Sequence, residues 1–136
     1  MKIAITGGGT GGHLNIAKCL LEAALSLDLE CIYIGSQSGQ DKKWFENEMK
    51  FSAKYFLPSS GVVDKKGFTK VKSFFHILNL SFTAQKILKH NQIQAVFSVG
   101  GYSAAAASFG ALLAGVPLFL HEQNSKSGSL NSLLKP

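Results

Sequence analysis

Two glycine-rich turns hold the residues of this sequence that are best suited to chemistry. The segments Gly7-Gly8-Gly9-Thr10-Gly11-Gly12-His13 and Gly100-Gly101-Tyr102-Ser103 each follow a short apolar run, and each opens a helix-like stretch of small residues. The N–H groups at a helix start have no partner within the helix. Where no Cβ stands in the way, they can surround a phosphate. The two turns therefore predict a site for a diphosphate or for two separate anions.

Polar side chains accompany both turns. His13 falls in the first turn of a predicted helix, where the positive end of the helix dipole favours a neutral imidazole that can act as a base or hydrogen-bond donor. The segment His121-Glu122-Gln123-Asn124 directly follows another apolar run. Its four polar groups are more than a turn requires, and they either belong to the site or brace the glycine turns.

Alternating strands and helices must position these residues. The apolar pattern predicts five strands, at 2–6, 30–35, 53–58, 94–99 and 117–121. It predicts helices after the first glycine turn and at 41–49, 68–90 and 103–114. This alternation indicates an α/β fold with a doubly wound parallel sheet. If the first and fourth strands are neighbours, both glycine turns and the His121 segment meet at the carboxyl edge, where such sheets bind ligands.

Length and composition indicate one soluble domain over residues 1–136. The chain has 46% hydrophobic residues, enough for a single core. No Lys, Arg, Asp or Glu occurs between Lys89 and Glu122, but glycines and a proline interrupt this stretch, so we do not expect a membrane span. Cys19 and Cys31 lie in no metal-binding pattern, and we expect both to be buried free thiols.

Other phosphate-binding classes fit the first turn poorly. Gly7, Gly9 and Gly12 match the dinucleotide pattern GxGxxG, but the second predicted strand ends without the acidic residue that holds a ribose hydroxyl. A nicotinamide or flavin site is therefore not favoured. His13-Leu14 also stands where a nucleoside-triphosphate loop needs Lys followed by Ser or Thr, which excludes that loop.

The predicted helix at 68–90 has two possible roles. Residues 50–90 carry eight lysines against one acidic residue. In this region four phenylalanines have lysines beside them, namely Phe68, Phe74, Phe75 and Phe82 with Lys65, Lys66, Lys70 and Lys72. A broad apolar stripe is typical of a helix that covers a core, whereas aromatic residues beside lysines suit an anionic membrane surface. Both interpretations stay open. Nucleic acid is not expected as a partner, because this region has no arginine and no recognised binding motif.

The three motifs together, in this order and spacing, closely resemble the amino-terminal domain of the MurG family of bacterial N-acetylglucosaminyltransferases. The resemblance extends over essentially the whole chain. It implies a Rossmann-like half of a GT-B glycosyltransferase that acts in peptidoglycan synthesis. The implied reaction is inverting transfer of GlcNAc from UDP-GlcNAc to the C4 hydroxyl of undecaprenyl-diphosphate-MurNAc-pentapeptide (lipid I), which gives lipid II. It further implies no cofactor, no obligatory metal, and peripheral attachment to the cytoplasmic face of the anionic inner membrane.

The resemblance also assigns roles to particular residues. By matching motif, the acceptor diphosphate would be held by residues of the two glycine turns, namely Thr10, Gly11, Gly12, Gly100 and Gly101. His13 becomes the candidate base or a diphosphate contact, and Glu122 a supporting or acid/base residue. Tyr102 would neighbour this site and Asn124 would contact the sugar. Phe74, Phe75, Leu78 and Phe82 would form the membrane-facing surface.

Two departures from the family pattern bear on the prediction. Asn15-Ile16 stands where a proline is usual, and Ser103-Ala104 follows the second glycine pair where Gly-Pro is common, so the loop shapes can differ. The family enzymes are also more than twice as long, and their second domain supplies most of the nucleotide-sugar site. We therefore interpret the chain as an acceptor-binding half that lacks the donor-binding domain and is inactive alone. The alternatives are one subunit of a split GT-B transferase and a non-catalytic membrane-surface module.

Overall fold

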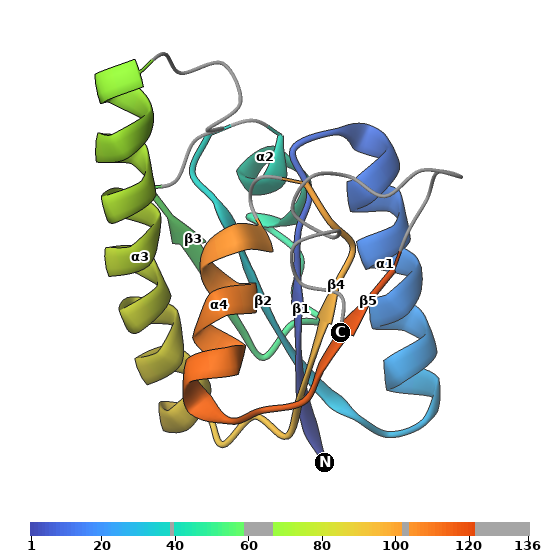
Figure 1. The fold of residues 1–136 in the computed structure, drawn as a ribbon. Coiled ribbons are helices and arrows are strands. Elements are labelled where there is room, and N and C mark those ends of the chain that lie inside the picture. Colours follow the sequence, from blue (N-terminus) through green and yellow to red (C-terminus); the bar gives the residue numbers. More distant parts are fainter. Residues whose placement is uncertain (39, 59–66, 102–103, 122–136) are drawn as a thin grey trace.

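The computed structural model of the chain describes residues 1–38, 40–58, 67–101 and 104–121, and of residues 67–74 it describes the backbone alone. Strands and helices alternate through this part of the chain (Figure 1). The strands are β1 (Lys2–Thr6), β2 (Glu30–Ser36), β3 (Ala53–Leu57), β4 (Ala95–Ser98) and β5 (Leu118–Leu120). The helices are α1 (Gly11–Ser26), α2 (Asp41–Phe45), α3 (Gly67–His90) and α4 (Ala105–Ala114).

The five strands form one parallel sheet in the order β3-β2-β1-β4-β5. This confirms the predicted α/β class, and β1 and β4 are neighbours, which is the condition that the sequence analysis set for a shared site. The strand order reverses between β1 and β4, whose last residues Thr6 and Ser98 are in register. The two glycine turns follow these residues, so they leave the sheet side by side at its carboxyl edge.

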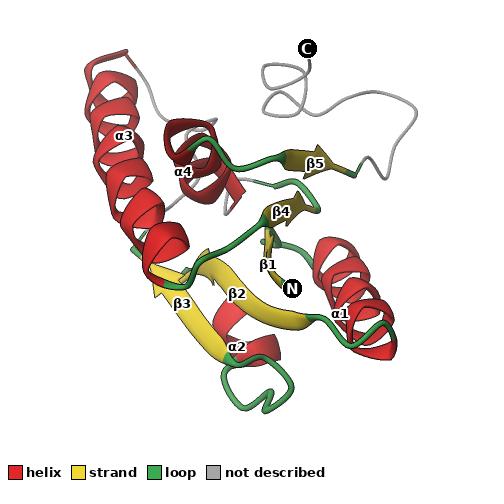
Figure 2. Ribbon diagram, turned by 90° about the horizontal axis from the view of Figure 1, so that it is seen from below, coloured by secondary structure: helices red, strands yellow, loops and turns green. Residues whose placement is uncertain are grey.

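Helices cover both faces of the sheet, with α1 and α2 on one side and α3 and α4 on the other (Figure 2). In β1, Ile3 and Ile5 pack toward α1, whereas Ala4 packs toward α3 and α4. The central strands are therefore apolar on both faces, as parallel strands between two helical layers must be. Because both faces of these strands are packed, their carboxyl ends are held in place, and the site lies at these ends.

The observed structure corrects two details of the sequence prediction. The helix predicted at 41–49 ends at Phe45. Cys31 is buried as expected, but the expectation for Cys19 is wrong, because it lies on the solvent-facing side of α1, two residues after the buried Ala17. On α3 the buried side chains include Ile77, Leu80, Ala84 and Leu88.

The interpretation of the α3 aromatic residues as core is wrong for those whose side chains are described. Phe75, Leu78 and Phe82 are 62%, 39% and 47% exposed. Their spacing of three and four residues places them on one stripe of the helix, away from the stripe that packs on α4 and the sheet. The side chain of Phe74 lies outside the described residues. No helix in the described ranges combines the length and the apolar character needed to cross a bilayer.

Candidate glycine-turn site

The two glycine turns touch each other through their backbones. Gly8 N–H donates to the carbonyl oxygen of Gly100 over 3.1 Å. Gly8 and Gly101 have φ angles of +155° and +83°, which L side chains rarely adopt. A Cβ on Gly101 would lie 2.3 Å from the Gly8 carbonyl oxygen, and one on Gly7 would lie 2.6 Å from that of Gly100. Glycine is thus required for the turns to meet.

Thr10 is the N-cap of α1, and the two residues that follow it have N–H groups without an acceptor among the described residues. Its extended backbone makes it the N-cap, and its Oγ1 accepts a hydrogen bond from the His13 N–H at 3.4 Å. Gly11 and Gly12 are the first residues of the helix, so their N–H groups have no intrahelical acceptor. Within the part of the chain that the structure describes, no other group accepts from them. The helix start therefore offers two adjacent donors at the positive end of its dipole.

The imidazole of His13 is half-buried beside this helix start. Its Nδ1 lies 2.8 Å from Thr10 Oγ1. Burial lowers the pKa of His13 below its ordinary value, the charge of Asp41 opposes this shift, and His121 adds to it. The lowered pKa favours the neutral imidazole that the sequence analysis expected, but its main cause is burial and not the helix dipole. A neutral ring can donate from one nitrogen and accept at the other.

Asp41 ties the first glycine turn to the end of β2. Its carboxylate is fully buried; Oδ1 accepts from the Gly9 N–H at 2.6 Å, and Oδ2 accepts from the Ser36 N–H at 2.9 Å. The sequence analysis placed this residue only at the start of a short helix. The signal that it missed is topological: β1 and β2 are neighbours, so the loop that follows β2 must lie against the glycine turn that follows β1.

Tyr33 contacts the first glycine turn from the core. Its hydroxyl donates to the Gly7 carbonyl oxygen at 2.7 Å, within the core. The ring packs against Phe45 and Phe51, with centroid separations of 4.7 Å and 5.4 Å. A Cβ on Gly35 would lie 2.5 Å from this ring, so the close packing needs glycine there. No sequence motif pointed to Tyr33, because a tyrosine in an apolar strand is typical of any core.

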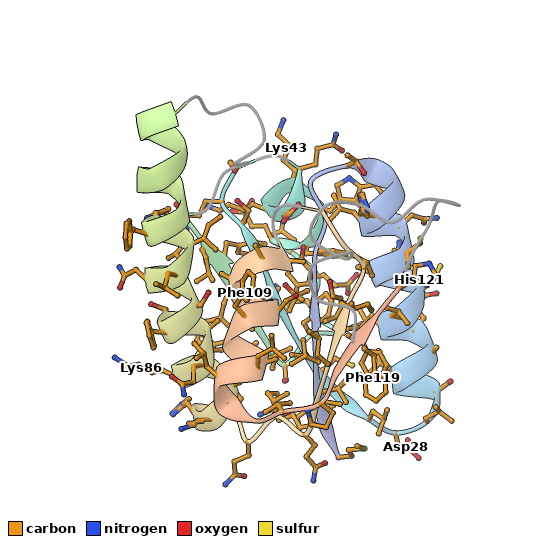
Figure 3. The ribbon with its side chains drawn as sticks, viewed as in Figure 1. Asp28, Lys43, Lys86, Phe109, Phe119 and His121 are labelled. Atoms are coloured by element: carbon orange, nitrogen blue, oxygen red, sulfur yellow. The ribbon has the colours of Figure 1, made fainter. Side chains whose placement is uncertain are left out.

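The predicted site residues within the described part of the chain come together at one edge. They are Thr10, Gly11, Gly12, His13, Gly100 and Gly101. His121 follows β5, its N–H donates to the Ser98 carbonyl oxygen at 2.9 Å, and Figure 3 shows its place beyond the end of that strand. Tyr102, Glu122 and Asn124 lie outside the described residues. The described side chains include no group of three potential metal ligands.

The comparison with protein families decides where this chain belongs. A model described as the glycosyltransferase family 28 N-terminal domain matches residues 3–136. This chain belongs to glycosyltransferase family 28. The predicted resemblance to the MurG family is confirmed by relatives that match over the entire chain.

Two similar proteins carry the same name. A protein of Campylobacter jejuni is 64% identical over all 136 residues, and one of Nitratiruptor is 55% identical over the same length. Both are named UDP-N-acetylglucosamine–N-acetylmuramyl-(pentapeptide) pyrophosphoryl-undecaprenol N-acetylglucosamine transferase. The family 28 chain covers 40% and 41% of these two proteins, so it spans about two fifths of the length of the relatives that it matches.

A solved structure agrees with the fold. The crystal structure of Acinetobacter baumannii MurG matches 98% of this family 28 chain with a TM-score of 0.80 at 25% sequence identity. The match covers 38% of that longer chain. The doubly wound sheet of residues 1–121 is therefore the architecture expected for the amino-terminal half of a GT-B glycosyltransferase.

Proposed function

We propose that this chain is the acceptor-binding domain of a GlcNAc transferase of peptidoglycan synthesis. In the complete enzyme, GlcNAc passes from UDP-GlcNAc to lipid I and gives lipid II. The chain forms one domain over residues 1–136, and the nucleotide-sugar donor binds mainly to a second domain. The observation that carries this proposal is 64% identity over the whole chain to a relative named for that reaction, together with the glycine turns at the sheet edge.

The diphosphate of lipid I is the group that the glycine turns suit best. The N–H groups of Gly8 and Gly9 are already used, by the Gly100 carbonyl and by Asp41. Gly11 and Gly12 therefore supply the donors, at the positive end of α1, while Gly100 and Gly101 allow the diphosphate to approach without a Cβ in its way. Thr10 fixes the start of this helix.

His13 has two possible roles, and they correspond to its two neutral tautomers. If Nδ1–H donates to Thr10 Oγ1, the lone pair of Nε2 is available to take the proton from the attacking C4 hydroxyl. The hydroxyl oxygen then bonds to C1 of GlcNAc as the bond from C1 to UDP breaks. If Thr10 donates to Nδ1 instead, Nε2–H is a donor for the diphosphate. The lowered pKa of His13 is compatible with both roles, because each of them uses the neutral ring.

Three residues outside the described part of the chain complete the proposal. Glu122 supports or shares the acid/base step, Tyr102 neighbours the diphosphate, and Asn124 contacts the sugar. These roles are inferred from the family motif. His121, which lies at the same sheet edge, precedes Glu122 and Asn124 in the sequence. No metal and no cofactor take part in this scheme.

The exposed stripe on α3 is the proposed membrane contact. Phe75, Leu78 and Phe82 share one face of the helix, in a region where lysines greatly outnumber acidic residues. Aromatic side chains can enter the headgroup region, and each lysine near an anionic surface contributes about 1 kcal/mol. The chain would then lie peripherally on the cytoplasmic face of the inner membrane, with Phe74 in the same patch. There it would meet lipid I from the side that carries the substrate diphosphate.

A chimaeric enzyme tests the proposed reaction. Residues 1–136 would replace the matching part of the Campylobacter jejuni relative, and transfer of radiolabelled GlcNAc to a short-chain lipid I analogue would be measured. We expect turnover at a rate close to that of the unmodified relative. A folded chimaera that binds UDP-GlcNAc and the analogue without turnover would favour the non-catalytic module. Turnover when the two halves are supplied as separate chains would show that a split transferase is possible.

A further inference from the structure

The buried carboxylate of Asp41 is the strongest feature of the site that the proposed chemistry does not use. It lies in the first turn of α2, and both of its oxygens accept backbone hydrogen bonds, from Gly9 and from Ser36. A Cβ on Gly8 would lie 2.5 Å from Asp41 Oδ1, so the turn closes tightly around the carboxylate. One side chain thus joins the glycine turn, β2 and α2.

We propose that Asp41 is a positioning residue for the acceptor diphosphate: its two hydrogen bonds hold the first glycine turn so that the N–H groups of Gly11 and Gly12 and the imidazole of His13 converge on the ligand. This inference rests on the proposed function. The free energy of a hydrogen bond to a charged group is larger than that of a neutral pair, which suits a carboxylate to this task. Asp41 itself touches no substrate.

Because Asp41 is charged, the direction in which its substitution changes ligand affinity tests the inference. A negative charge beside a diphosphate site repels the ligand, so its removal alone should tighten binding. If the hydrogen bonds to Gly9 and Ser36 outweigh this repulsion, replacement of the carboxylate should weaken ligand binding, because the glycine turn loses its conformation. An asparagine at this position tests both effects, since it has the same shape, no charge and only one oxygen to accept from two N–H groups.

The imidazole of His13 reports on the same arrangement. The groups that face it are Thr10 on its own helix, Asp41 from α2 and His121 from the segment after β5. Asp41 is the one that raises the His13 pKa, against the effects of burial and of His121. Loss of the Asp41 charge should therefore lower the His13 pKa further. This shift can be followed by NMR without any substrate.

The experiment compares the wild-type chain with Asp41→Asn and with the control Asp28→Asn. Asp28 is exposed at the opposite edge of the sheet, in the loop between α1 and β2, and its φ of +60° is one that asparagine accepts (Figure 3). Calorimetry would measure binding of a short-chain lipid I analogue. We expect Asp41→Asn to bind at least about tenfold more weakly and to show a lower His13 pKa, with Asp28→Asn unchanged in both.

Two other outcomes would refute either the positioning role of Asp41 or the proposed function. Equal or tighter binding by a folded Asp41→Asn variant would refute the positioning role. No binding by the wild-type chain would refute the proposed function, and this inference with it. If Asp41→Asn does not fold, hydrogen exchange of the wild-type Gly9 amide decides: slow exchange supports the bond to Asp41, and exchange at the rate of an open loop refutes it.

Discussion

Substitution of Gly101 by alanine tests whether the two glycine turns depend on their direct backbone contact. The new Cβ would lie 2.3 Å from the Gly8 carbonyl oxygen, closer than any Cβ is found, so the turns must separate. Separation weakens the hydrogen bond from Gly8 to Gly100, and a buried N–H that loses its acceptor costs about 1–3 kcal/mol. The positive φ of +83° adds about 1–2 kcal/mol for a residue with a Cβ.

Gly115→Ala is the matched control. Gly115 caps α4 with a φ of +71°, and a Cβ there would meet nothing within 4 Å. It therefore shares the conformational cost of about 1–2 kcal/mol and the gain from a less flexible unfolded chain, but not the clash. Urea unfolding of the two variants should show Gly101→Ala less stable by a further ~1–3 kcal/mol, and only this variant should lose affinity for the lipid I analogue. Equal losses of stability in the two variants would refute the contact between the turns.

Three further predictions concern His13, the exposed stripe on α3 and the two cysteines. His13→Ala in the chimaeric enzyme should lower kcat at saturating acceptor at least about a hundredfold. It should also remove the acid limb of the pH profile of kcat, which should lie below pH ~6.5 in the unmodified chimaera. A near-normal kcat with a raised KM would leave His13 as a diphosphate contact. A variant with serine at both Phe75 and Phe82 should stay folded but no longer sediment with anionic vesicles. Salt should weaken the sedimentation of the wild-type chain with the same vesicles. Unchanged sedimentation of the variant would refute the membrane patch. Cys19 should react with a thiol reagent at pH 8 in the folded chain, whereas Cys31, whose pKa burial raises to about 11, should react only in urea; two reactive thiols without urea would contradict this.

The sheet could be predicted because its signals are local. β1 begins and ends where the apolar run predicts, and the glycines that end it are needed for a turn with positive φ. The parallel topology then follows from the alternation of strands with helices, since parallel neighbours need a crossover between them. The meeting of the turns after β1 and β4 follows in turn from this strand order.

The contacts that hold the site could not be predicted in the same way. Asp41 bonds to Gly9 across 32 positions of sequence, and Tyr33 bonds to Gly7 across 26. Neither pair leaves a periodic signal, because each depends on how neighbouring loops lie once the sheet has formed. The face of α3 was ambiguous for a related reason. Its apolar residues surround the helix, so periodicity alone does not show that Phe75 and Phe82 are exposed while Ile77 and Leu80 are buried.

Ligand binding by the isolated chain tests the central claim, that this domain holds the acceptor. Calorimetry would compare a short-chain lipid I analogue with UDP-GlcNAc on the 136-residue chain. The glycine turns should bind the analogue through its diphosphate. UDP-GlcNAc should bind far more weakly, because we propose that a second domain supplies most of the contacts to the donor. UDP-GlcNAc binding as tight as that of the complete Campylobacter jejuni relative, without binding of the analogue, would contradict the assignment of this domain to the acceptor.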